Sequence, residues 1–141
     1  MSMLQRRRVV ITGMGTLNPC GNSVGETWDN LLAGKSGIGP IDRFDTTEFA
    51  CKIAGQVKGF NPDEYVDRKE QKKMDTFIQY AIAASRQAMK DGGLDDYPFT
   101  KEEREAFGVY IGSGIGGLKT SWDEASNSRG PRRTSPFFLP A

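Results

Sequence analysis

The chain has 141 residues, of which 37% are hydrophobic and 17 are glycine, a composition that suits a turn-rich α/β protein or a piece of a larger one. Its net charge of +1 argues against a protein built mainly to bind nucleic acid, and no apolar run approaches the roughly 18 residues of a membrane span. Histidine is absent and the two cysteines, Cys20 and Cys51, lack C-x-x-C spacing, so we expect no metal, no cofactor and no histidine-dependent chemistry from this chain alone.

The first expected elements are a strand and a helix. Residues 8–12 form a short apolar run that predicts a buried strand, ended by the turn at Gly13 and Gly15. Residues 23–26 predict a capping box, and Gly34 suits the C-terminus of the helix that follows. The apolar positions of this helix fall on one face: Val24, Trp28, Leu31 and Leu32.

Nothing near the N-terminus predicts export. The basic residues 6–8 precede only the apolar residues 9–11 before Thr12, too few for the core of a signal peptide. We therefore expect a cytoplasmic protein whose cysteines are free thiols.

A long helix is the clearest element of the middle of the chain. Residues 36–66 carry mixed signals, with a loop around Gly37 to Pro40 and a short strand within residues 53–57. A helical stripe then follows and ends at Gly92 and Gly93. Its members are Met74, Phe77, Ile78, Ala81, Ile82, Ser85 and Met89.

The last third of the chain repeats the order of strand and helix. Residues 100–103 predict a capping box for a short helix, and the apolar residues 107–111 predict a strand of the kind buried in parallel sheets. After the glycine-rich turn at 112–117, a brief helix is expected over 118–125. This order predicts an α/β protein with a mainly parallel sheet. The apolar residues 137–139 call for burial that this chain can hardly provide.

The glycine-rich turn has an obvious alternative interpretation. Gly112, Gly114 and Gly117 satisfy the G-x-G-x-x-G pattern of a dinucleotide-binding turn. Such a turn needs a further helix and strand after it, whereas only 24 residues follow Gly117 and they include three prolines. A dinucleotide-binding oxidoreductase is therefore a distant alternative. Ser113 is not a hydrolase nucleophile elbow, because Ile111 stands where that motif needs glycine.

Several motifs, taken in order, resemble the β-ketoacyl-acyl carrier protein synthases, and most closely the synthase II subgroup of fatty-acid synthesis. The resemblance covers essentially the whole chain. The residues that carry it are 7–15, 61–62 leading into 67–70, 74–77, 111–117 and 131–138.

This resemblance implies a thiolase-like fold with layers in the order αβαβα, of which residues 1–141 would supply part of the N-terminal half. It implies a homodimer that performs a decarboxylative Claisen condensation. In that reaction an acyl chain moves from acyl carrier protein to a cysteine, and malonyl on a carrier protein loses carbon dioxide and attacks the thioester. No nucleic acid or membrane partner is implied.

The chain departs from the family in one decisive respect. The family's nucleophilic cysteine lies in an Ala-Cys-Thr-like turn at a helix N-terminus, and two histidines follow later. Neither Cys20 nor Cys51 matches that turn, and no histidine is present. We therefore expect the first third or so of a synthase, with no catalytic residue of its own and no activity alone. The alternatives are a truncated protein that only docks the carrier, and a chain-length factor or polyketide ketosynthase.

Candidate site residues also follow from the resemblance. Synthases dock their acidic carrier proteins through a basic patch, and the matching residues in this chain are Lys69, Lys72, Lys73, Arg132 and Arg133. The alternative is a solvated basic surface. Ile115 matches a residue that faces the acyl pocket, and Phe138 matches an aromatic that reaches toward the partner's pocket in the dimer. For both, the alternative is an ordinary core or interface position.

Overall fold

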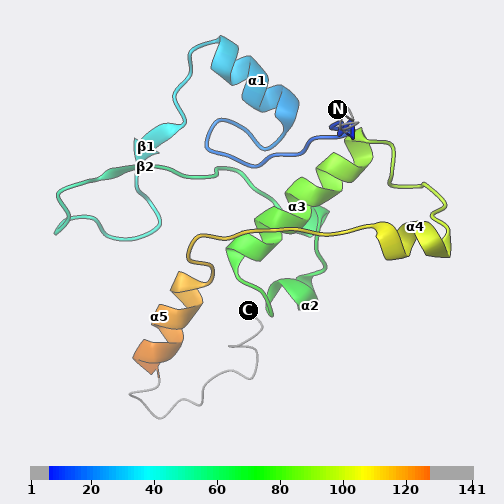
Figure 1. The fold of residues 1–141 in the computed structure, drawn as a ribbon. Helices are drawn as coiled ribbons and strands as arrows, with labels where there is room; N and C mark the ends of the chain where they lie inside the picture. The colour runs from blue at the N-terminus through cyan, green and yellow to red at the C-terminus, as the bar shows by residue number, and fades with distance from the viewer. Residues whose placement is uncertain (1–6, 128–141) are drawn as a thin grey trace, which may run out of the picture.

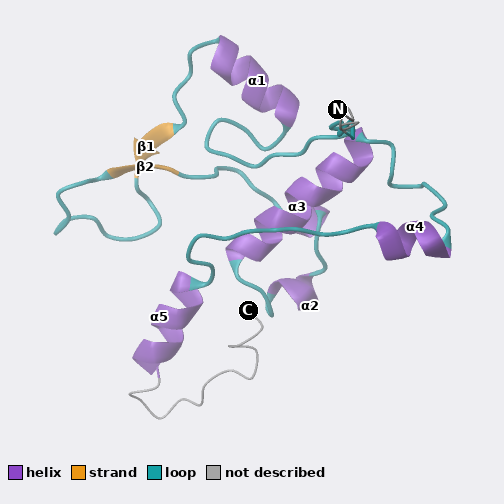
Figure 2. Ribbon diagram, in the orientation of Figure 1, coloured by secondary structure: helices purple, strands orange, loops and turns teal. Residues whose placement is uncertain are grey.

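Helices predominate in the structure, a computed structural model that describes residues 7–127 (Figures 1 and 2). Five α-helices, one 3-10 helix and one pair of strands are found in these residues. In chain order they are α1 (Val24–Leu32), β1 (Ile38–Pro40), β2 (Ile53–Gly55), the 3-10 helix η1 (Pro62–Glu64), α2 (Arg68–Gln71), α3 (Thr76–Asp91), α4 (Lys101–Ala106) and α5 (Leu118–Asn127).

The long helix α3 is the element around which the other segments are arranged (Figure 1). The segment before α1 lies directly on it at two glycines. A Cβ on Gly13 would stand 2.2 Å from the Ala88 carbonyl oxygen, and one on Gly15 would stand 2.0 Å from that of Ala84. Only glycine permits so close an approach of two backbones. The turn predicted at these glycines is therefore a contact surface for α3.

Polar contacts from α3 hold the same segment in register. The Met14 amide donates to Asp91 Oδ2 over 2.8 Å, and the Thr16 amide donates to Gln87 Oε1 over 3.1 Å. Gln87 Nε2 in turn donates to the Asn22 carbonyl over 2.7 Å. The backbone of residues 14–22, which has no sheet partner among residues 7–127, thus finds part of its hydrogen bonding on α3 side chains.

The helix ends largely follow the sequence pattern. Ser23 Oγ accepts from the Glu26 amide at the start of α1, as a capping residue should. The Glu26 carboxylate accepts from the Asn22 amide instead of closing the predicted box on Ser23. Gly34 follows α1 with φ +65, the left-handed conformation that favours glycine. At α4 the predicted box between Thr100 and Glu103 is complete in both directions.

The two strands form a small antiparallel hairpin. Ile38 pairs with Gly55 and Pro40 pairs with Ile53. Arg43, in the loop between the strands, ties this hairpin to α3, since its guanidinium donates to the Tyr80 hydroxyl over 2.8 Å. The strand predicted within residues 53–57 is confirmed over its first half.

The mainly parallel sheet predicted from the sequence is wrong for residues 7–127. Segments 8–12 and 107–111 are extended in backbone but belong to no sheet, and Val9 is 92% and Tyr110 99% exposed. A strand is stabilised by the neighbours that pair with it, and the described residues place none beside these two segments. Only Val66 and Ala83 are buried apolar side chains in this part of the chain.

No helix within residues 7–127 is both long and apolar enough to cross a lipid bilayer.

Candidate functional site

The basic residues predicted to open the long helix lie on a separate element. Lys69 is in the four-residue helix α2, while Lys72 and Lys73 lie in the turn that follows it. Helix α3 begins later, at Thr76, with Asp75 as its N-cap. The expectation that these cations oppose the dipole of the long helix is therefore wrong. An acidic residue stands at that helix terminus, which suits its dipole.

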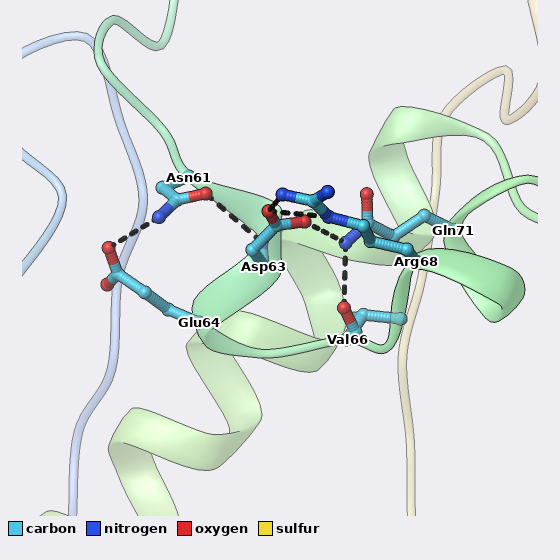
Figure 3. Close-up of polar contacts among 6 residues, drawn as sticks. All are labelled: Asn61, Asp63, Glu64, Val66, Arg68 and Gln71. Carbon is cyan, nitrogen blue, oxygen red and sulfur yellow. Dashed lines mark hydrogen bonds and ion pairs between the residues drawn. The ribbon is translucent and has the colours of Figure 1, made fainter.

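A polar cluster at the base of α2 fixes how this helix is presented (Figure 3). Arg68 makes a forked contact with Asp63 Oδ2, with Nη2 at 2.6 Å and Nε at 3.0 Å. Gln71 Nε2 donates to Asp63 Oδ1 over 2.9 Å and to the Val66 carbonyl over 2.7 Å. Asn61 Oδ1 accepts from the Asp63 amide, so the turn of η1 is joined to α2.

The same cluster sets the charge of its members. Hydrogen bonds from Arg68 and then Gln71 lower the pKa of the Asp63 carboxyl below its ordinary value. The Asp63 carboxylate raises the pKa of Arg68 further above an already high value. The Asp63–Arg68 pair is therefore fully ionised near neutral pH.

The lysines that follow Arg68 face solvent. Lys69 and Lys72 are exposed, and neither makes an ion pair with any residue from 7 to 127. Lys73 is half-buried and pairs with Glu70, with Nζ 2.5 Å from Oε1. The cluster beneath α2 thus leaves two uncompensated cations on the surface and a third that is partly neutralised.

The glycine-rich turn at 112–117 lies against the beginning of α3. Gly116 has φ +71, and a Cβ built on it would lie 3.6 Å from Cζ of Phe77. The Gly116 amide donates to Ser113 Oγ over 3.1 Å, which closes the turn on itself. Ile115, the candidate pocket residue, is 78% exposed at this turn.

Asp75 connects this turn region to the basic patch, a link that sequence reasoning missed. Its Oδ2 accepts from the Thr120 hydroxyl over 2.7 Å, and its Oδ1 accepts from the Thr76 amide over 2.6 Å. Burial raises the pKa of Asp75, but the hydrogen bonds from Thr120 and Thr76 outweigh burial and the pKa lies below its ordinary value. An aspartate just before a helical stripe was the available signal for its capping role. Its bond to Thr120, 45 positions away, left no mark in the sequence pattern.

The candidate residues therefore fall into two groups. Lys72, Lys73 and Ile115 come together at the N-terminal end of α3, through the turn before the helix and through the Gly116 contact. Arg132, Arg133 and Phe138 lie outside the described residues. Cys20 and Cys51 are free thiols, and residues 7–127 contain no cluster of three acidic or cysteine ligands suited to a metal ion.

Comparison with known families decides where this arrangement belongs. Residues 6–141 match the family described as "Beta-ketoacyl synthase, N-terminal domain". The chain belongs to the β-ketoacyl synthase family. The resemblance noted in the motifs is confirmed, and the motif positions at Lys69, Asp75 and the glycine-rich turn all lie inside the matched region.

Individual ketosynthases place the chain more closely. It is 50% identical over 140 residues to the 3-oxoacyl-[acyl-carrier-protein] synthase 2 of Vibrio cholerae serotype O1, and 48% identical over 141 residues to that of Staphylococcus aureus strain COL. Each match covers 98% of this chain and 33% of the relative. The chain therefore spans about one third of the length of the curated relatives it matches.

A solved structure confirms the fold class. "The ishigamide ketosynthase/chain length factor" superposes with a TM-score of 0.73 at 30% identity, covering 95% of this chain and 33% of that one. The chain thus has the α/β fold of a ketosynthase N-terminal domain, which is thiolase-like. In that light the extended segments 8–12 and 107–111 keep the path of a ketosynthase chain without its ladder of hydrogen bonds.

Proposed function

We propose that this chain is the N-terminal part of a 3-oxoacyl-acyl carrier protein synthase of the second type, an acyltransferase of fatty-acid elongation. The observation that carries the proposal is the 48–50% identity to two synthase 2 proteins over 98% of the chain. The reaction is condensation: an acyl group is held on a cysteine, malonyl on acyl carrier protein loses carbon dioxide, and the resulting carbanion displaces the thiolate.

Residues 1–141 do not perform that reaction alone. The chain has no histidine to stabilise the developing oxyanion. Its thiols are also poorly placed, since Cys20 lies in the turn before α1 and Cys51 hydrogen-bonds to the Ile53 carbonyl in the hairpin. Neither sits at a helix N-terminus, where the dipole would favour a thiolate. The role of this part is to dock the carrier and to form part of the acyl pocket.

Carrier docking is assigned to the exposed cations around α2. Lys69 and Lys72 face solvent without ion-pair partners in residues 7–127, and Lys73 stands beside them. An acidic carrier protein is the complementary partner. Exposed pairs of this kind add only about 0–1 kcal/mol each, so the patch mainly steers association. Arg132 and Arg133 belong to the same proposed patch by resemblance.

The acyl pocket is assigned to Ile115 and Phe138. Ile115 is 78% exposed at a turn that contacts α3, so its side chain is available to line a pocket completed by other residues. Phe138 would contribute across the interface of a homodimer. Cytoplasmic location is part of the same proposal, because the carrier-dependent reaction uses cytoplasmic substrates.

A chimera tests the catalytic proposal. Residues 1–141 replace the matching third of the Vibrio cholerae synthase 2, and condensation of acyl with malonyl carrier protein is assayed. Activity in the chimera, with none from residues 1–141 alone, is the expected result. Condensation by the 141-residue chain alone would overturn its assignment as a non-catalytic part. An inactive chimera that folds as a dimer would overturn the synthase assignment.

Charge reversal tests the docking patch in the same chimera. Lys69→Glu and Lys72→Glu should each slow association with acyl carrier protein several-fold at low salt, and the difference should shrink as salt rises. Lys101→Glu is the matched control, since Lys101 is an exposed lysine on α4. Equal slowing by all three variants would mean that only net charge matters, not this patch.

A chain-length factor is the second candidate function. The solved structure that superposes on this chain is a complex of a ketosynthase with a chain length factor, and the fold is compatible with either partner. The residue at the nucleophile position of the complete protein discriminates, because cysteine supports condensation and glutamine does not. A third possibility, a truncated protein that only docks the carrier, is tested by the intact mass of the purified protein, which for this chain alone is 15.5 kDa.

A further inference from the structure

We propose that Asp75 is a positioning residue that fixes the turn at 112–117 and thereby the acyl chain lengths that the synthase accepts. The part that concerns chain length rests on the proposed function, since Ile115 matters to specificity only if this turn lines an acyl pocket. The part that concerns attachment stands on contacts within the described residues.

The first contact is the shared carboxylate. Asp75 Oδ1 accepts from the Thr76 amide over 2.6 Å, and Oδ2 accepts from the Thr120 hydroxyl over 2.7 Å and more weakly from the Thr120 amide over 3.4 Å. The half-buried side chain therefore binds the first turn of α3 and the first turn of α5 at once. A charged acceptor makes these bonds stronger than neutral ones.

The second contact lies four residues earlier on the α5 side. Gly116 faces the ring of Phe77, and its positive φ excludes most other residues from this position. Two points of attachment, at Gly116 and at Thr120, thus fix the segment that leads into α5. Ile115 is the residue next to the first of these points, so its placement depends on both.

The hydrogen bonds within the turn set its shape but not its location. The Gly116 amide bonds to Ser113, and the Leu118 amide donates to the Gly116 carbonyl over 2.9 Å. These bonds survive if the whole turn moves away from α3. The bond between Asp75 and Thr120 is lost in such a movement, and that difference makes it testable.

The test compares Thr120→Val, which removes the hydroxyl at nearly constant volume, with Thr120→Ser, which keeps it. Both variants are made in the full-length native protein. Hydrogen exchange is followed at the amides of residues 113–121, and kcat and KM are measured for a series of acyl thioesters of increasing length. Thr47→Val is the matched control, because Thr47 makes a similar hydroxyl bond to Asp45 in the distant hairpin loop.

Thr120→Val is expected to speed exchange at these amides about tenfold, the effect of losing one hydrogen bond to a charged group. It is also expected to change the ratio of kcat/KM between long and short acyl chains at least threefold, mainly through KM. Thr120→Ser should restore both values, and Thr47→Val should alter neither.

Three outcomes oppose the proposal in distinguishable ways. Unchanged exchange in Thr120→Val overturns the attachment itself. Faster exchange with an unchanged chain-length ratio overturns the specificity role. If the wild-type protein shows no condensation at all, the proposed function fails, and the exchange result alone then upholds or overturns the attachment.

Discussion

The side-chain carbonyl of Gln87 lies 3.1 Å from the backbone nitrogen of Thr16, 71 positions earlier in the chain. The amide end of the same side chain donates to the Asn22 carbonyl and to the Tyr65 hydroxyl. One partly buried glutamine therefore joins three separate segments to α3. It holds the chain before α1 in place where no sheet does.

Replacing this glutamine should be costly. Gln87→Met keeps the length of the side chain but leaves the Thr16 amide and the Asn22 carbonyl without this partner. We expect a loss of about 1–3 kcal/mol in the free energy of unfolding, measured by urea denaturation. Arg86→Met, at the exposed neighbouring position, should stay within about 0.5 kcal/mol of the wild type. Equal losses in the two variants would contradict the linking role of Gln87.

A pair of glycine substitutions tests the close approach to α3. In Gly15→Ala the new Cβ would meet the Ala84 carbonyl oxygen at 2.0 Å and the Ala88 amide nitrogen at 2.7 Å, so backbone must move. A loss of at least about 1–3 kcal/mol is expected. Gly25→Ala has open space around it and lies within α1, where alanine should add about 0.5–1 kcal/mol. Thermal unfolding of both variants gives the comparison, and a stabilised Gly15→Ala protein would refute the contact.

The ion pair between Lys73 and Glu70 gives a prediction about carrier association. Glu70→Gln removes an anion from the proposed docking face and frees Lys73 from this partner. We expect association with acyl carrier protein to become up to about threefold faster at low salt, measured by stopped-flow fluorescence. Glu105→Gln removes an anion from a similar exposed pair on α4, with Lys101. If Glu105→Gln speeds association equally, the effect is one of net charge.

The carboxyl of Asp75 should titrate below its ordinary value of 3.8. Because its pKa is lower in the folded state than in the unfolded chain, its contribution to stability is present above pH 3.8 and disappears as the pH falls through the folded value. The groups that face it are Thr76, Thr120 and Lys119, whose charge also lowers the pKa. Carbon NMR of the carboxyl measures this midpoint. In Thr120→Val the midpoint should move upward, and an unmoved midpoint would mean that Thr120 does not set it.

Local signals in the sequence were sufficient for the helices. The apolar stripe from Met74 onward, the serine and threonine caps and the terminal glycines each act over a few residues, and helices built from such contacts lie where they are predicted. The long helix begins at Thr76, two residues after the first residue of the stripe. The four motifs likewise identified the family, because short ordered patterns survive without any knowledge of the fold.

Non-local features could not be predicted in the same way. An apolar run such as residues 107–111 indicates that a strand is favoured, but the strand itself needs hydrogen-bonding neighbours that propensity does not supply. The site shows the same limit. Lys69 and Lys72 are marked by charge alone, whereas the Asp75–Thr120 contact depends on two segments meeting across α3. The roles of Lys69, Lys72, Lys73 and Ile115 stay predictions until the carrier and acyl substrates are tested.

The extended, exposed backbone around Tyr110 makes this residue a natural clock for strand pairing. Proteases bind their substrates as single extended strands, and Tyr110 offers a 99% exposed aromatic side chain on such a strand. Chymotrypsin should cut after it and release α5 from the helices that precede it. Any polypeptide that pairs with residues 107–111 hides the same peptide bond. The rate of this single cut therefore reports how much of the time the segment is a strand in a sheet.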